Sequence, residues 1–105
     1  MKIQHALGAA AILAALTARA ASEDQHATST LDVAQLFATT CGYCHANAGR
    51  AAGKGPQLMN TARSDDFIRN RIKNGKEGAM PAFGKSFSDS EIDRIIAYIR
   101  ALKPQ

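Results

Sequence analysis

The sequence contains no tryptophan, and only four phenylalanines and two tyrosines among 105 residues. Aromatic side chains therefore cannot fill the interior by themselves, and a chain this short often needs a disulfide, a metal or a cofactor for part of its stability. Strand-like alternation of apolar and polar residues, internal repeats and an apolar run of membrane-spanning length are also missing. These absences argue against a β-sheet domain, a repeat protein and an integral membrane protein.

Positive charge is present but not clustered. The formal net charge of +4 falls to +2 when Lys2 and Arg19, which lie in the N-terminal segment discussed next, are set aside. The other lysines and arginines are scattered through residues 50–103. A nucleic-acid-binding domain needs a basic patch, so we expect no nucleic acid partner. The mild positive excess favours weak electrostatic docking on another protein.

Residues 1–20 have the features of a secretory signal peptide. Lys2 gives a positive start, residues 6–18 are apolar and uncharged, and Ala18-Arg19-Ala20 places small residues at alternate positions. A membrane-spanning helix needs about 20 apolar residues, more than this run offers. An uncleaved anchor is the alternative, which the weakly hydrophobic alanines disfavour. We expect cleavage near Ala21, export to the periplasm and no stable membrane insertion.

Residues 21–30 are polar and predict a flexible leader, whereas residues 31–105 predict one all-α domain, which we expect to be monomeric. A first helix is predicted from Leu31, with Thr30 as its cap. Its apolar stripe consists of Leu31, Ala34, Phe37 and Ala38.

Two more helices are predicted further along. One begins at Ser64, is followed by two acidic residues and ends at Asn74-Gly75. The other opens with the capping box Ser88-Asp89-Ser90-Glu91 and is followed by Pro104. The apolar face of the earlier helix is Phe67, Ile68 and Ile72, and that of the later helix is Ile92, Ile95, Ile96, Ile99 and Leu102, extended by Tyr98.

Long segments containing glycine and proline separate these helices, at residues 46–60 and 75–87. Loops of this length are uncommon in a compact domain unless they carry function. We therefore expect both loops to wrap around a bound group.

Both cysteines and one of the three histidines lie in CGYCH, residues 41–45. A redox dithiol would follow a strand in a βαβ unit, and the chain offers no strand. A structural zinc needs four ligands, for which only Cys41, Cys44, His45 and His26 are available. A simple disulfide remains an alternative in an oxidising compartment.

Cys-X-X-Cys-His is also the attachment sequence of a c-type haem. The two thiols add across the two vinyl groups of the porphyrin, and the adjacent His45 supplies an axial nitrogen to the iron. We therefore predict one haem c, bound covalently through Cys41 and Cys44. Met59, Met80 and His26 are the candidates for the sixth position on the iron.

At this level of motifs the chain resembles the class I cytochromes c. CGYCH, GPQL, NGKEGAMPAFG and SDSEIDRIIAYIRALK occur in that family's order, and the resemblance covers residues 31–103. The third motif is especially similar to small bacterial and photosynthetic electron carriers. The resemblance implies a cytochrome c fold of about three helices with long loops around the haem. It also implies thioethers at Cys41 and Cys44, with His45 as the proximal and Met80 as the distal ligand.

The resemblance further implies that the carbonyl of Pro56 accepts a hydrogen bond from His45, and that Phe37 and Tyr98 meet where the first and last helices cross. Many family members carry glycine four residues before that phenylalanine, where this chain has Val33. Either Ala34 makes the close helix contact or the crossing is wider.

Position along the chain favours Met80 over Met59 as the distal ligand. Met59 follows His45 by fourteen residues, on the loop expected to carry Pro56 on the proximal side. Met80 follows by thirty-five residues, beyond a whole helix, which lets the chain reach the opposite face of the haem. Met59 is then expected to be a packing residue.

An iron with two protein ligands has no place for a substrate, so we expect a one-electron carrier and not an enzyme. Its partners would be a donor dehydrogenase, such as a quinoprotein dehydrogenase, or a reductase complex, and an acceptor such as an oxidase. A haem peroxidase or ligand sensor with a displaceable Met80 is the alternative. Basic residues expected near the haem would steer an acidic partner: Arg50, Lys54, Lys73, Lys76 and Lys85.

Overall fold

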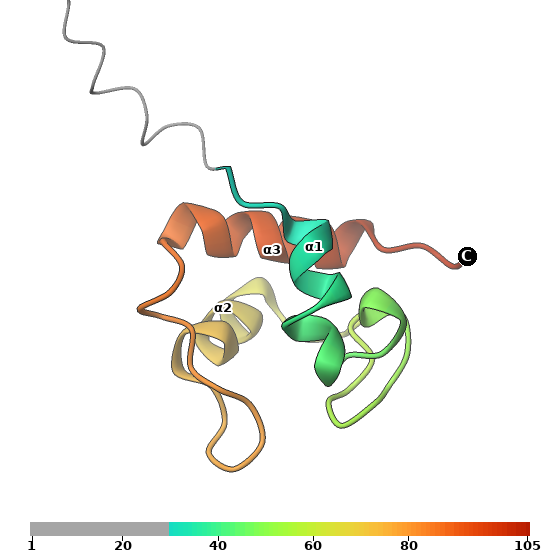
Figure 1. Cartoon of the computed structure of the whole chain (residues 1–105), viewed down its shortest axis with the longest axis horizontal. Helices are drawn as coiled ribbons and strands as arrows, with labels where there is room; N and C mark the ends of the chain where they lie inside the picture. Colours follow the sequence, from blue (N-terminus) through green and yellow to red (C-terminus); the bar gives the residue numbers. More distant parts are fainter. Residues whose placement is uncertain (1–29) are drawn as a thin grey trace, which may run out of the picture.

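The computed structural model describes residues 30–105 (Figure 1). The predicted signal peptide and all but the last residue of the predicted leader lie outside the described residues. The elements in chain order are α1 (Val33–Ala38), the 3-10 turns η2 (Cys41–Tyr43) and η3 (Asn47–Gly49), α2 (Asp65–Asn74) and α3 (Asp89–Ala101). No strand forms among the described residues, so the predicted all-α class with three helices is confirmed. None of the helices in this part has the length and apolar content of a membrane span.

Helix α1 begins at Val33, later than the predicted start at Leu31. Its cap is Asp32 and not Thr30, because the Asp32 carboxylate accepts a hydrogen bond from the Gln35 backbone N–H at 3.0 Å. Asp and Thr are both good capping residues. The sequence pattern alone therefore left the exact start of this helix undetermined.

The buried face of α1 also differs from the predicted apolar stripe. Val33 and Phe37, one turn apart, are buried, whereas Ala34 and Ala38 are exposed. The Phe37 ring stacks on Tyr98 of α3, with ring centroids 4.6 Å apart, as the resemblance implied. Val33, and not Ala34, is therefore the residue buried one turn before Phe37. The prediction that Ala34 and Ala38 belong to the apolar face was wrong.

Helix α2 is capped by Ser64, whose hydroxyl accepts from the Phe67 N–H at 3.1 Å, as predicted. Ile68 and Ile72 are buried. Phe67 was predicted on the same face, but its side chain is 37% exposed. The guanidinium carbons of Arg63 and Arg71 lie 4.5 and 5.0 Å from its ring centroid. The two arginines cover the ring by cation–π contact in place of the core.

Helix α3 carries most of the core. Its capping box is present: Glu91 N–H donates to the Ser88 hydroxyl at 3.2 Å, and Ser88 N–H donates to the Glu91 carboxylate at 2.9 Å. Burying an isoleucine side chain contributes about 1.5–3 kcal/mol, so the helix stabilises the fold chiefly through its apolar face. The buried apolar residues of the described chain are Val33, Phe37, Ile68, Ile72, Ile92, Ile95, Ile96, Ile99 and Leu102.

Ion pairs on the surface hold α2 beside α3. Arg69 pairs with Asp93 at 2.7 Å and Lys73 with Asp89 at 2.8 Å. Two long loops then extend from this frame, residues 46–64 after η2 and residues 75–88 between α2 and α3. In Figure 1 both loops lie on the same side of α3. The helices thus serve as a frame from which two loops project together.

Candidate cofactor site

The segment with both cysteines continues directly from the end of α1. Tyr43 N–H donates to the Thr39 carbonyl at 3.1 Å, and His45 N–H donates to the Cys41 carbonyl at 3.0 Å. This last bond is a helical i to i+4 bond, so Cys41, Cys44 and His45 follow one another around a single turn. Both cysteines are free, half-buried thiols. The fold therefore places the two sulfurs and the imidazole on one short, ordered unit.

His45 is buried, with 9% of its surface exposed. Its Nδ1 lies 2.8 Å from the carbonyl oxygen of Pro56. A carbonyl oxygen can only accept, so Nδ1 carries a hydrogen and donates it, and a neutral imidazole in this tautomer has its lone pair on Nε2. In the described part of the chain no hydrogen bond engages Nε2. The hydrogen bond implied by the resemblance is present, and it leaves the nitrogen that a metal would need.

The backbone of Gly55 lies directly against the His45 ring. A Cβ at this position would lie 2.7 Å from Cε1 and 3.0 Å from Nδ1 of that ring, closer than real contacts allow. The Gly55 N–H also donates to the Cys44 carbonyl at 2.8 Å. Sequence analysis did not single out Gly55. The only available signal was its place directly before Pro56.

Met59 belongs to the same loop. The N–H groups of Leu58 and Met59 both donate to the Gly49 carbonyl at 2.9 Å. Met59 is thus held on the segment that carries Pro56, within three residues of the carbonyl that bonds His45. This is where the sequence argument expected a packing residue.

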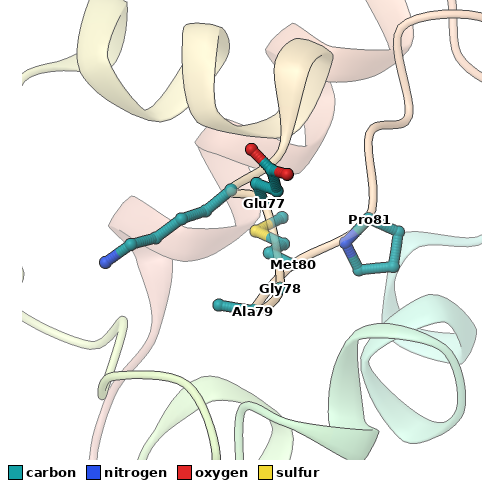
Figure 2. Close-up of a pocket in the computed structure, with 6 residues that line it drawn as sticks. Glu77, Gly78, Ala79, Met80 and Pro81 are labelled. Carbon is teal, nitrogen blue, oxygen red and sulfur yellow. The ribbon is translucent and has the colours of Figure 1, made fainter.

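Met80 lies on the other loop, between α2 and α3. Its side chain is half-buried and packs against the apolar core, as do Cys41 and Leu58. The segment Lys76–Pro81 surrounds a shallow surface hollow of about 360 Å³. Figure 2 shows the Met80 and Pro81 side chains leaving the loop in different directions. Cys41 and Met80 therefore contact one core from two separate segments.

The donor set fits a covalent haem better than the other cofactors considered. Burial raises the pKa of the Cys41 thiol, whereas redox-active and zinc-binding cysteines have a lowered pKa. Within residues 30–105 no three His, Cys, Asp or Glu side chains are grouped as a metal site. Two thiols on one turn, an imidazole with a bare Nε2 and a thioether are the groups that a His/Met-ligated haem c requires.

The basic residues expected beside the haem fall into two groups. Arg50 donates through Nε to the Lys103 carbonyl at 2.7 Å, and Lys73 pairs with Asp89, so these two are engaged within the chain. The remaining three are exposed: Lys54, Lys76 and Lys85. The predicted set of five is therefore reduced to three available ammonium groups.

Comparison with known proteins agrees with this chemistry. Residues 28–99 match the family model described as cytochrome C oxidase, cbb3-type, subunit III. The chain is 37% identical over 71 residues to the cytochrome c6 of Gracilaria tenuistipitata var. liui, covering 62% of this chain and 65% of that protein. It is 34% identical over 71 residues to the cbb3-type oxidase subunit CcoP of Helicobacter pylori, covering 61% of this chain and 24% of CcoP.

A solved structure of a c-type cytochrome has a fold similar to that of this chain. The c-type cytochrome NirC superposes with a TM-score of 0.51 at 22% identity, over 63% of this chain and 86% of NirC. The chain spans just under two thirds of the length of the cytochrome c6 above, and the family match covers most of the described residues. On this evidence the chain belongs to the cytochrome c family, with an all-α fold and one haem c attached covalently at Cys41 and Cys44.

Proposed function

We propose that this chain is a periplasmic one-electron carrier in which His45 and Met80 hold the two axial positions of the iron. The haem supplies reversible one-electron exchange between its ferric and ferrous states. The observation that carries the proposal is the 2.8 Å contact between His45 Nδ1 and the Pro56 carbonyl. It fixes the tautomer and the orientation of a buried imidazole, and it raises the basicity of the nitrogen directed away from Pro56.

Met80 is the proposed distal ligand. It is half-buried, sits in a loop closed by backbone hydrogen bonds, and lies on a different segment from the one that holds His45. Met59 lacks this separation because it lies on the loop of residues 46–64, which also carries Pro56, the hydrogen-bond partner of His45. A thioether is a soft, neutral ligand, and pairing it with histidine favours the ferrous state and a raised midpoint potential.

Two protein ligands on the iron would also disfavour a peroxidase or a ligand sensor. With both axial positions filled, neither a peroxide nor a gas can reach the iron. A peroxidase or a ligand sensor would instead require Met80 to leave. The optical spectrum of the ferric protein separates these functions: the proposal predicts a low-spin spectrum with a sulfur-to-iron charge-transfer band in the far red. A high-spin ferric spectrum would favour the peroxidase or sensor.

The partners are proposed from chemistry and from the relatives' names. CcoP is named as a subunit of a cbb3-type oxidase, and we propose an oxidase or a reductase as acceptor for this chain. The proposed donor is a dehydrogenase, quinoprotein dehydrogenases included, or a reductase complex. Exposed Lys54, Lys76 and Lys85 would orient acidic partners in short-lived complexes, which suits a carrier that must release each partner quickly.

The proposal includes the processing of the N-terminus. Residues 1–20 are removed as a signal peptide, residues 21–30 form a leader, and residues 31–105 act as one monomeric domain. Intact mass of the protein purified from the periplasm measures the cleavage site directly. A mass that includes residues 1–20 would contradict this part of the proposal and leave the haem chemistry untouched.

A further inference from the structure

The turn before Met80 is closed by a reciprocal pair of backbone hydrogen bonds. Lys76 N–H donates to the Met80 carbonyl and Met80 N–H donates to the Lys76 carbonyl, each at 2.8 Å. These bonds fix the Met80 backbone relative to residue 76, which immediately follows the cap of α2. The position of Met80 is thus set by the end of the helix.

The segment after Met80 returns to the same helix end. Phe83 N–H donates to the Ile72 carbonyl at 2.9 Å, and Gly84 N–H donates to the Lys73 carbonyl at 3.0 Å. These are carbonyls of the last turn of α2, which have no partner within the helix. Residues 75–84 therefore form a loop that begins and ends on the C-terminal turn of α2.

Gly75 stands where the two sides of this loop meet. It ends α2 with φ at +68°, and its N–H donates to the Arg71 carbonyl at 2.8 Å. A Cβ on Gly75 would collide with the Met80 carbonyl oxygen, and would lie 2.7 Å from the Pro81 carbonyl carbon and 2.8 Å from the Ala82 nitrogen. All three are backbone atoms, so no side-chain rotation could relieve the contact.

We propose that Gly75 is a positioning residue for the distal ligand. Because it has no side chain, the backbone of residues 80–82 can lie directly against the end of α2, and this close approach sets where the Met80 thioether is presented. The inference rests on the proposed function, since it assumes that Met80 is the iron ligand. Gly75 acts through Met80 and touches no cofactor itself.

Gly78 provides the control that the test needs. It lies in the same loop and also has a positive φ, at +72°. A Cβ at Gly78 would meet no atom within 4 Å. Alanine at either position carries the strain of a positive φ, but only alanine at Gly75 pushes on the Met80 segment. A comparison of the two variants separates displacement of the ligand from backbone strain.

The experiment compares haem-loaded wild type, Gly75→Ala and Gly78→Ala. Three properties are measured: the far-red charge-transfer band of the ferric protein, the midpoint potential, and the carbon monoxide affinity of the ferrous protein. In Gly75→Ala we expect a weakened band, a lower potential and an apparent carbon monoxide affinity raised by about tenfold, because carbon monoxide binds only where the sulfur has left. Gly78→Ala should keep all three near wild type even if its thermal midpoint falls. Equal changes in both variants, or no change in either, would overturn the inference.

Two further variants keep every outcome informative. If Gly75→Ala does not accumulate with haem, Gly84→Ala tests the contact by which the end of this loop returns to α2. Its Cβ would lie 2.9 Å from the Lys73 carbonyl oxygen, and a wild-type band in that variant would reject the premise of the inference, that closure of this loop on α2 sets the position of Met80. Met80→Ala separates this inference from the function. A band retained in Met80→Ala refutes the proposed function, whereas a band lost there and intact in Gly75→Ala refutes only the role of Gly75.

Discussion

The imidazole of His45 and the carbonyl of Pro56 are joined by a hydrogen bond of 2.8 Å, eleven residues apart in the chain. Gly55 lies against the same ring, so one short segment supplies both the acceptor for Nδ1 and the surface on which the ring rests. Orientation and tautomer of His45 therefore depend on the backbone of two adjacent residues. No side-chain partner is required.

Gly55→Ala should disturb this arrangement. The new Cβ would lie 2.7 Å from His45 Cε1 and must move either the ring or the loop. Overpacking of this kind costs about 1–3 kcal/mol of unfolding free energy, and loss of the Pro56 hydrogen bond should also lower the basicity of Nε2 and shift the midpoint potential. Chemical denaturation and redox titration of the haem-loaded protein measure both effects. The matched control is Lys54→Ala at the exposed neighbouring position, and equal behaviour of the two variants would contradict the prediction.

Local rules predicted much of the fold. The caps at Ser64 and Ser88 and the buried face of α3 follow from short-range patterns, and the structure confirms them. The errors arose where several residues of similar propensity compete. Asp32 displaced Thr30 as a cap, and Phe67 is covered by two arginines at i−4 and i+4, a solution that hydrophobic periodicity cannot distinguish from burial in the core.

In the candidate site, the motif residues could be predicted from the sequence, whereas the contacts that support them could not. The motif CGYCH and the Met-Pro pair carry their chemistry within a few neighbouring residues, so sequence alone could propose Cys41, Cys44, His45 and Met80. The supporting contacts of Gly55 and Gly75 are between segments, and they depend on how a loop returns to a helix or a ring. A glycine in a sequence does not reveal which distant backbone approaches it.

Removal of the attachment cysteines should leave the chain largely unfolded. The described core is small, six isoleucines with Val33, Phe37 and Leu102, and the two long loops contact it through partly buried side chains such as Leu58, Met80 and Phe83. The double variant Cys41→Ala, Cys44→Ala, produced without haem, should show low helical circular dichroism and no sharp thermal transition. Tyr43→Ala, at an 85% exposed position inside the same motif, should still bind haem and fold. Native-like helicity with cooperative melting in the double variant would refute the expectation.

The ion pair between Lys73 and Asp89 should make stability depend on pH in the acid range. The hydrogen bond and charge of Lys73 hold the pKa of the Asp89 carboxyl below its ordinary value of 3.8. A folded pKa below the unfolded one stabilises the protein above the unfolded pKa, and this contribution is lost as pH falls through the folded pKa.

Urea denaturation of wild type, Lys73→Met, Asp89→Asn and the double variant tests this linkage. We expect a favourable coupling between the two positions at neutral pH that disappears at low pH, once the carboxyl is protonated. A coupling that persists unchanged at low pH would show that charge is not its source.

The exposed lysines should speed the reaction with anionic oxidants. Replacing Lys54, Lys76 and Lys85 by glutamine should slow oxidation of the ferrous protein by ferricyanide by about tenfold at low ionic strength, with the difference shrinking as salt rises. The charge-matched control replaces Arg63, Arg71 and Lys103 by glutamine. Stopped-flow kinetics measures both, and equal slowing in the two triple variants would mean that only net charge matters.

The most direct test of the account is the far-red absorption band of the ferric protein in Met80→Ala and Met59→Ala, both loaded with haem. The account predicts that Met80→Ala loses the band and has a lower midpoint potential, and that its ferrous form binds carbon monoxide. Met59→Ala should keep all three properties close to wild type, because a hydrogen bond to the Gly49 carbonyl holds Met59 on the loop that carries Pro56. The opposite pattern, with the band lost in Met59→Ala and retained in Met80→Ala, would contradict the proposed ligation and the carrier function that rests on it.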